Sequence, residues 1–278
     1  SSIPNRPLLL MRAALNYFSS DIRCWIILFF VIRLYGITDP PLEAAHNWRQ
    51  ACGCMVARNF LEVDANIFYP RVDMAGEKTG ITGTEFPALN YMIYLVSKVF
   101  GYTHWYGRLI NLIVSSIGTY FFFLLVKKYF NPKAALYSTI VLLSSIWFAY
   151  SHKTMPDTFS VSIALVSLYS GMLYLERHQF KWLVVFFLTG ALALLSKIPS
   201  AVILSAFLIP VFDGIYQSRS KVLFAITAVL VLSIAGTWYF HWVPYLVEKY
   251  GYWHYFMGTD LREGARALLD NPFNTTEK

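Results

Sequence analysis

Charged side chains suited to phosphate and proton chemistry recur beside the apolar runs of this sequence. They are His46 and Arg49 in HNWR, Arg71 and Asp73 in YPRVD, Glu85 in TEFP, Lys153 and Asp157 in SHKTMPD, and Lys197 in LLSKIPS. Guanidinium and ammonium groups bind phosphate oxygens. A carboxylate can take a proton from a hydroxyl or bind a metal ion. These residue types predict a site for a substrate that carries a phosphate and loses or gains a proton.

Each of these residues also has an ordinary structural role that the sequence leaves open. The alternatives are solvation of a loop carboxylate, contact of Arg49 and Arg58 with lipid headgroups, a cap or surface position for His46, an N-cap for Asp157, a membrane-boundary position for Lys197, and a helix cap for Glu85. Taken singly, each signal is weak. Their placement on one side of a membrane is the stronger indication.

The composition predicts an integral membrane protein. Of the 278 residues, 56% are hydrophobic and only 14% are charged, and the mean hydropathy is +0.47. A soluble domain usually has about 25% charged residues. The net charge of +7 does not indicate nucleic-acid binding, because the basic residues fall in short loops between apolar runs. Cys24, Cys52 and Cys54 are predicted to be plain buried thiols rather than a disulfide framework.

Uncharged runs predict seven membrane-spanning helices. The runs are residues 24–38 (interrupted by Arg33), 109–126, 134–151, 158–175, 182–196, 198–212 and 222–240. Several reach the length needed to cross a bilayer, about 20 residues, only with flanking Tyr, Trp and Ser residues. Basic residues gather in KKYFNPK, ERHQFK and QSRSK and before the first span. Because cytoplasmic loops carry the excess of Lys and Arg, these segments are predicted inside and the alternate loops outside.

The first outer loop, residues 39–104, holds seven of the sixteen acidic residues and is expected to be the chemically active part. Its segment 87–101 begins with proline, which suits a first helical turn, and is 15 residues long. We therefore predict an interfacial or re-entrant helix there. The alternative, in which this segment crosses the membrane, breaks the charge alternation downstream.

A second helix is predicted over residues 44–60, lying on the membrane with two different faces. At 100° per residue one face carries His46, Arg49, Gln50 and Gly53, and the opposite face carries Trp48, Cys52 and Met55. Tryptophan suits the membrane interface. The glycine leaves room for another group to approach the backbone.

Six segments, taken in order, resemble a known family. They are HNWRQACGCMVARNF, NIFYPRVD, GTEFPALNYMIYLVSKVFG, GRLINL, MPDTFSVSIAL and LLSKIPSAVIL. They resemble bacterial GT-C glycosyltransferases of the dolichyl-phosphate-mannose protein mannosyltransferase/aminoarabinose transferase superfamily, and most closely the family 39 branch. The resemblance runs from Arg33 to about Gly258.

The resemblance implies an all-α polytopic membrane protein: a seven-span GT-C module with a large first outer loop containing interfacial helices. Family members are longer, so we expect a fragment. The module would cover residues 1–278, with 39–104 as the outer catalytic loop and 243–278 as the start of a further outer segment.

Two departures from the family pattern affect the site. EFPALNY resembles the family stretch EKPPLNY, which contacts donor phosphate or metal, but Phe86 stands where the family often has lysine. The well-known members also carry an Asp-Glu pair nine and eight residues before the arginine that matches Arg58. Those positions hold Arg49 and Gln50 here, so the usual catalytic aspartate is absent.

The resulting assignments are as follows. The catalytic candidates are Asp73, Glu85, Glu43 and Asp157. The substrate-binding candidates are His46, Arg49, Arg58, Arg71, Lys153 and Lys197. Glu85 and His46 are also candidate ligands of a divalent metal, and no other cofactor is predicted.

The predicted function is transfer of a sugar from a polyprenyl-phosphate donor to a glycan, lipid or protein acceptor. The partners would be that donor, the acceptor and membrane lipids, with no nucleic acid. The predicted location is the bacterial inner membrane, with the active site on the periplasmic side. Two other classes stay open: a non-catalytic scaffold subunit of a glycan pathway, and a transporter of a lipid-linked saccharide. A transporter is expected to place ionisable groups in mid-membrane.

The charge alternation makes a topology prediction. Single cysteines that replace Asp73, Asp157 and Lys197, in a background without the native three, should react from outside with an impermeant thiol reagent. A cysteine that replaces Lys128 should react only from inside. Labelling of positions 128 and 157 from the same side would contradict the predicted topology.

Overall fold

The computed structural model describes residues 20–41, 46–212 and 218–250. Within these ranges the chain is helical, and strand-like pairing is limited to an isolated antiparallel bridge between Arg71 and Ile81. The elements are α2 (Ile22–Leu34), α3 (Asn47–Glu62), α4 (Ala88–Phe100), α5 (Tyr106–Tyr129), α6 (Pro132–Ser144), α7 (Ile146–Ala149), η1 (Tyr150–His152), α8 (Pro156–Arg177), α9 (Phe180–Ser196), η2 (Ile198–Ser200), α10 (Ala201–Leu204), η3 (Ser205–Phe207), α11 (Leu208–Phe212), α12 (Ser218–Thr237), the π-helix η4 (Trp238–Trp242) and α13 (Val243–Tyr250). The all-α polytopic fold is as predicted.

Every predicted span overlaps a helix, but the helices differ in length. Among the described residues, three helices are long and apolar enough to cross a membrane: Tyr106–Tyr129, Pro156–Arg177 and Arg219–Tyr250. The pair Pro132–Ser144 and Ile146–His152, bent by 52°, would make a fourth. The helices of the other three runs are shorter, so the number seven stays a prediction.

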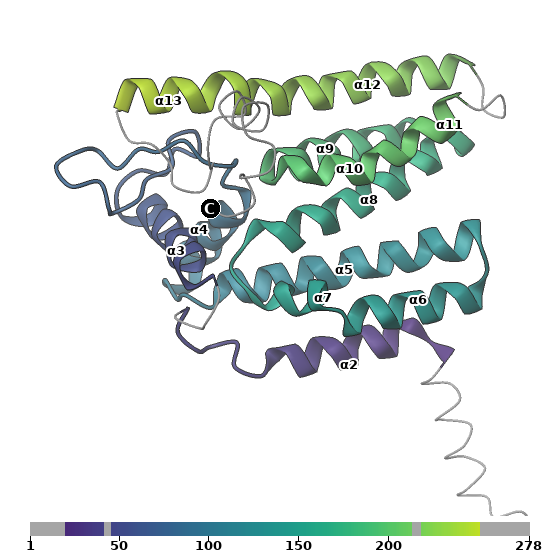
Figure 1. Ribbon diagram of the computed structural model, residues 1–278, viewed down its shortest axis with the longest axis horizontal. Helices are drawn as coiled ribbons and strands as arrows, with labels where there is room; N and C mark the ends of the chain where they lie inside the picture. Colours follow the sequence, from purple (N-terminus) through teal and green to yellow (C-terminus); the bar gives the residue numbers. More distant parts are fainter. Residues whose placement is uncertain (1–19, 42–45, 213–217, 251–278) are drawn as a thin grey trace, which may run out of the picture.

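The longer helices run beside one another, and α3, α4 and the loop between them lie together at one end of this bundle (Figure 1). The last helix, α12–η4–α13, extends over that end. Residues 127–133, 176–181 and 218–221 lie at the other end (Figure 1), where Lys128 pairs with Glu176 and Ser220 Oγ is 2.7 Å from His178 Nδ1. The side of the membrane that each end faces stays a prediction.

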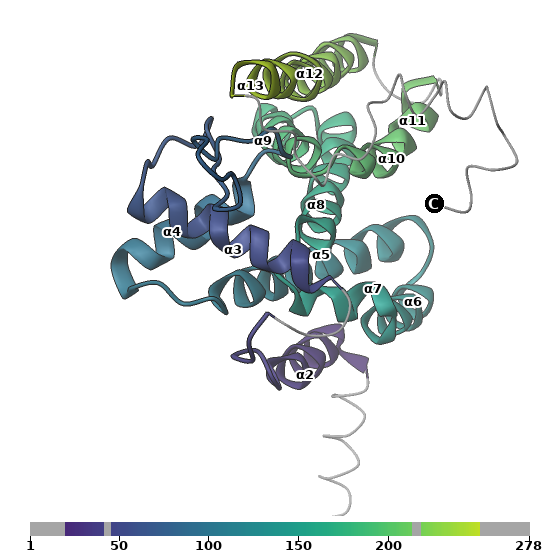
Figure 2. The ribbon, with the colours of Figure 1, turned by 60° about the vertical axis from the view of Figure 1, so that its left-hand side comes forward.

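Helix α4 is a short element of 13 residues, as predicted for the segment 87–101. At 1.5 Å per residue it is about 20 Å long, less than the roughly 30 Å of a bilayer core. It packs beside α3 outside the row of long helices (Figure 2). Its interfacial or re-entrant position stays a prediction.

Helix α8 is the centre of the bundle because it carries small residues on the faces that meet its neighbours. In the window that could span a membrane, 78% of its residues are buried. Ser160 Oγ donates to the carbonyl of Ala193, and Ser167 Oγ donates to the carbonyl of Phe186, both on α9. Since lipid supplies no hydrophobic force between helices, small residues and such bonds hold them together.

The start of the loop 39–104 is anchored by a fully buried arginine. Arg108, near the start of α5, has 0% of its surface exposed. Its guanidinium donates to the carbonyls of Gly36, Ile37, Asp39 and Pro40 at 2.9–3.4 Å. These bonds hold the chain as it leaves α2, and they explain how a buried charge is tolerated at this depth.

The α5–α8 contact generates a stability prediction. A Cβ added at Gly118 would lie 2.4 Å from Ser162 Cβ and 2.5 Å from Ser162 Cα, so Gly118→Ala must push the helices apart. Overpacking of this kind costs about 1–3 kcal/mol. We expect a clearly lower thermal unfolding midpoint in detergent.

Gly236→Ala is the matched control, because the nearest atom to its added Cβ is Phe240 Cδ2 at 3.9 Å. Alanine favours a helix over glycine, so this variant should unfold at the wild-type temperature or above. Equal losses in the two variants would contradict the close α5–α8 contact.

Candidate functional site

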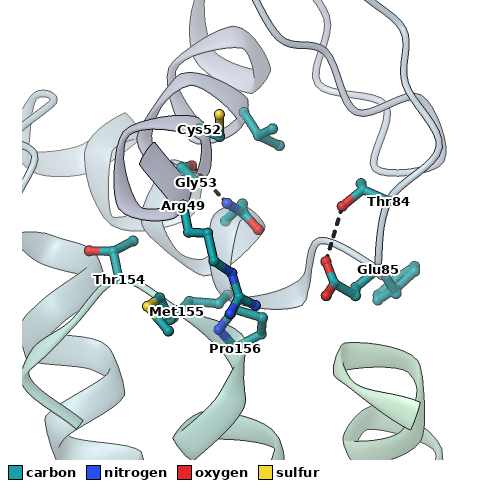
Figure 3. A pocket seen from close by; sticks show the side chains of 12 residues that line it. Arg49, Cys52, Gly53, Thr84, Glu85, Thr154, Met155 and Pro156 are labelled. Carbon is teal, nitrogen blue, oxygen red and sulfur yellow. Dashed lines mark hydrogen bonds between the residues drawn. The ribbon is translucent and has the colours of Figure 1, made fainter. Parts of the chain in front are cut away.

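A cavity that is open to solvent lies between α3, the loop ahead of α4 and the start of α8 (Figure 3). It is lined by Arg49, Cys52, Gly53, Val56, Thr84, Glu85, Phe86, Leu89, Asn90, Thr154, Met155 and Pro156. Charged, polar and apolar groups all face it, which suits a ligand with both an apolar and an anionic part.

An alternating row of four charges runs beside this cavity, and we refer to it as the ionic chain. Arg49 Nη2 lies 3.3 Å from Asp157 Oδ2, Asp157 Oδ1 lies 3.5 Å from Lys197 Nζ, and Lys197 Nζ lies 2.8 Å from Glu85 Oε1. Glu85 Oε2 accepts a hydrogen bond from Thr84 Oγ1 at 3.3 Å. The ionic chain thus brings together four of the residues predicted from sequence.

The ionic chain is only partly hydrated. The side chains of Lys197 and Glu85 are 20% and 17% exposed, less than those of the Arg58–Glu62 pair at 42% and 60%. Ion pairs shielded from water interact more strongly than exposed ones. The stability of each of these two partly buried charges therefore depends on its ion-pair partner.

Local structure places Lys197 and Glu85 in the ionic chain. Lys197 is the C-cap of α9 in an extended conformation, at the turn predicted from sequence. The backbone N–H of Phe86 donates to the carbonyl of Leu195 at 3.0 Å, so the segment of Glu85 lies against the end of α9. The capping role considered for Glu85 is wrong, because α4 has Pro87 as its N-cap and the Glu85 carboxylate bonds to Lys197 and Thr84.

Asp157 lies in the first turn of α8, where the helix dipole favours a carboxylate. The N-cap is Met155, so the N-cap role considered for Asp157 is wrong. A buried amide on α5, Asn111, fixes the segment before it: Asn111 Nδ2 donates to the carbonyls of Lys153 and Met155, and Thr158 Oγ1 donates to Asn111 Oδ1. Sequence reasoning missed Asn111, although an amide inside an apolar run is a signal for a buried polar role.

Helix α3 turns its predicted polar face toward the site. Arg49 and Gly53 line the cavity, and Gln50 Oε1 accepts from the backbone N–H of Thr154 at 3.3 Å. The carbonyl of Gly53 accepts from Asn90 Nδ2 at 2.7 Å, so the close approach expected at this glycine occurs. Asn90 was not among the predicted site residues.

The predicted opposite face of α3 is only partly correct. Trp48 is exposed, but Cys52 is buried and lines the cavity. Leu89 and Asn90 of α4 line the same cavity as Cys52. Burial, with the charge of Asp73 nearby, raises the pKa of Cys52 to about 11, and burial also raises the pKa of Cys54. Both thiols therefore stay protonated at neutral pH, as plain buried cysteines do.

The other predicted loop residues form a second cluster that does not line the cavity. Asp73 pairs with Arg58 and accepts from Asn59 Nδ2 at 2.9 Å. Arg71 donates to the carbonyl of Thr79 at 3.0 Å, and its Nη2 lies 3.7 Å from Asp64 Oδ2. These bonds tie the long loop to α3. The substrate and catalytic roles of Arg58, Arg71 and Asp73 stay predictions.

His46 and Lys153 meet the same aromatic ring. His46 Nε2 lies 3.2 Å from Tyr150 Oη, and Lys153 Nζ lies 5.7 Å from the centre of the Tyr150 ring. His46 precedes α3 with a left-handed φ of 62° and makes no side-chain cap bond. The predicted catalytic residue Glu43 lies outside the described residues.

Metal binding by Glu85 and His46 stays a prediction. In the described part of the chain, no group of three His, Cys, Asp or Glu side chains is close enough to hold an ion. His46 bonds to Tyr150, whereas Glu85 bonds to Lys197 and Thr84.

The helical bundle with a charged cavity at its loop end has the fold of a polytopic membrane protein. Residues 84–241 match the family model described as dolichyl-phosphate-mannose-protein mannosyltransferase, and the chain belongs to this family. The matched region contains Glu85, Asp157 and Lys197 but not Arg49.

A solved structure supports the same fold. The chain is similar to ArnT from Cupriavidus metallidurans in the apo state, with a TM-score of 0.55 and 15% sequence identity over 81% of this chain. The match covers 42% of that chain, so the present sequence spans less than half of its length. No curated protein matches the sequence.

The ionic chain makes a stability prediction that needs no substrate. In a double-mutant cycle of Glu85→Gln and Lys197→Met, the two residues should couple by about 1–2 kcal/mol, because the pair is partly desolvated. The exposed pair Arg58 and Glu62, 3.7 Å apart and four residues from each other on α3, is the control. It should couple by only about 0.3–0.5 kcal/mol. Coupling of Glu85 and Lys197 no larger than that of the control would contradict a shielded ionic chain.

Proposed function

We propose that this chain takes a sugar from a polyprenyl-phosphate donor and attaches it to a hydroxyl of a glycan, lipid or protein on the outer side of the membrane. The observation that carries the proposal is the ionic chain beside an open, partly apolar cavity at the loop end of the bundle. Membership of the mannosyltransferase family supports the reaction type. The sugar and the acceptor are not specified by these residues.

Arg49 and Lys197 are the groups proposed to bind the donor phosphate. Both contact Asp157 at 3.3 and 3.5 Å, longer than the 2.8 Å between Lys197 and Glu85. The bonds to Asp157 are thus the weaker ones, and phosphate oxygens can replace them at low cost. Lys197 would then supply the positive charge that the family often places at the position of Phe86.

Glu85 is the carboxylate proposed to take the proton. It lines the cavity itself, whereas Asp73 is engaged by Arg58 and Asn59 away from it. The acceptor oxygen forms a bond to C1 of the sugar while the bond from C1 to the phosphate oxygen breaks. The bonding electron pair leaves with the lipid phosphate, and the acceptor proton passes to Glu85.

A transporter of lipid-linked saccharides is the second candidate, and one observation favours it. The α6–α7 pair is a broken helix bent by 52°, a feature that transporters use at their binding sites. The ionic chain lies at the end of the bundle and not at its middle, which favours the transferase.

The two candidates differ in the product they form. The full-length protein, supplied with a panel of radiolabelled polyprenyl-phosphate sugars and a mixed acceptor, should release the lipid phosphate and label the acceptor. Movement of intact donor across proteoliposomes without release would support the transporter and overturn the transferase.

Glu85→Gln tests the proposed base, because the amide keeps the shape of the side chain and loses the charge. General-base catalysis contributes about 10²–10⁴-fold, so the transfer rate should fall by at least about a hundredfold. Glu176→Gln is the matched control, since it breaks the Lys128–Glu176 pair at the other end of the bundle. Wild-type turnover in Glu85→Gln would refute this role, and the base would then be sought at Asp157 or Glu43.

A further inference from the structure

The last long helix contains a π-helical turn, η4, beside the ionic chain. A π turn is less stable than α-helix and is found mostly at functional positions. Its first two residues are Trp238 and Tyr239, which are 5% and 8% exposed. Both carry one polar atom that must find a partner when buried.

Each of these two side chains bonds to a segment that carries one partner of the Glu85–Lys197 pair. Trp238 Nε1 donates to the carbonyl of Thr84, next to Glu85, at 2.9 Å. Tyr239 Oη donates to the carbonyl of Leu195, two residues before Lys197, at 2.8 Å. Consecutive residues of one turn therefore hold both segments.

Packing around these bonds is close. The rings of Phe86 and Trp238 meet edge to face at 5.0 Å and 83°. A Cβ added at Gly83 would lie 2.8 Å from Val243 Cγ1 and 3.1 Å from the Val243 carbonyl oxygen, so the loop is pressed against the helix. The last helix therefore helps to set the position of Glu85, together with the bond from the Phe86 N–H to the carbonyl of Leu195.

We propose that Trp238 and Tyr239 are positioning residues that set the distance between Glu85 and Lys197, and through it the reactive geometry. We refer to the two residues as the clasp. The catalytic consequence rests on the proposed function, whereas the effect on the ion pair does not. The clasp does not touch the substrate. It acts through the two backbone segments that it binds.

The sequence offers a matched control one turn further along the same helix. Trp242 Nε1 also donates to a backbone carbonyl at 2.9 Å, but that carbonyl belongs to Phe68 in the long loop. Trp238→Phe and Trp242→Phe each delete one bond from an indole N–H to a backbone carbonyl and keep an aromatic ring; the first bond is buried and the second is exposed. Only the first of these variants loosens the Glu85 segment. Tyr239→Phe removes the bond to Leu195 by a change of one hydroxyl.

The first test measures the ion pair and needs no substrate. The Glu85–Lys197 coupling is obtained from unfolding midpoints in detergent, in the wild-type, Trp238→Phe and Trp242→Phe backgrounds. The coupling should fall at least twofold with Trp238→Phe and stay unchanged with Trp242→Phe. Unchanged coupling with Trp238→Phe, or an equal fall in both backgrounds, overturns the proposal. Should Trp238→Phe fail to fold, Tyr239→Phe takes its place with the same criteria.

The second test measures transfer and separates positioning from general stability. Trp238→Phe should lower kcat about tenfold in the wild-type background and add no further loss in the Glu85→Gln background, because it acts through that residue. Equal losses in both backgrounds would mean that Trp238 only stabilises the fold. If the wild-type protein transfers no sugar and the coupling still depends on Trp238, the clasp stands and the proposed function fails.

Discussion

Lys197 is shared between two carboxylates, and this sharing ties together the parts of the molecule that surround the cavity. Its ammonium lies 2.8 Å from Glu85 and 3.5 Å from Asp157, which in turn meets Arg49. These residues come from the turn after α9, the loop before α4, the start of α8 and helix α3. A partly buried charge without its partner lowers the stability of the fold, so the ionic chain is stable only when all four segments are in place. Bonds to backbone atoms hold these segments in place. They are made by Asn111, by Gln50 and by the clasp, which binds two of the segments.

The alternation of charges has a chemical consequence. Two cations and two carboxylates balance each other, and an incoming phosphate would add negative charge where Arg49 and Lys197 can meet it. Arg49 stands at a position where the resembled family usually has an aspartate, and its carboxylate partner here is Asp157, on α8. The site therefore still contains carboxylates. They are Asp157, on α8, and Glu85, in the loop ahead of α4.

Much of the fold follows from the sequence because apolar runs and short basic loops depend on local composition. The runs predicted the positions of the helices, and the lysines and arginines between them predicted which loops share one end of the bundle. The number of spans stays a prediction, because runs such as residues 182–196 are shorter than the roughly 20 residues that a bilayer requires. The burial of Cys52 was predicted, but its place at the cavity was missed, since periodicity identifies a face of a helix but not the element that this face meets.

The site was predictable in part for a similar reason. Glu85, Asp157 and Lys197 stand out as charges beside apolar runs, and the topology brought them to one end. Their pairing was not predictable, because each contact joins residues far apart in the chain. Glu85 and Lys197 are separated by 112 positions. Asn111, Trp238 and Tyr239 carry no charge, and their roles arise only from backbone carbonyls that the fold brings within reach. Arg71 and Asp73 looked equally suited to chemistry, yet they brace the loop.

The central claim is that the ionic chain receives the phosphate of a lipid-linked donor. The direct measurement is equilibrium binding of polyprenyl phosphate and of uncharged polyprenol to the full-length protein in nanodiscs. Wild-type protein should prefer the phosphate, and Lys197→Ala should lose about tenfold or more of that preference. Lys181→Ala, at the opposite end of the bundle, should retain it. Equal binding of the two lipids by wild-type protein, or an undiminished preference in Lys197→Ala, would contradict the account.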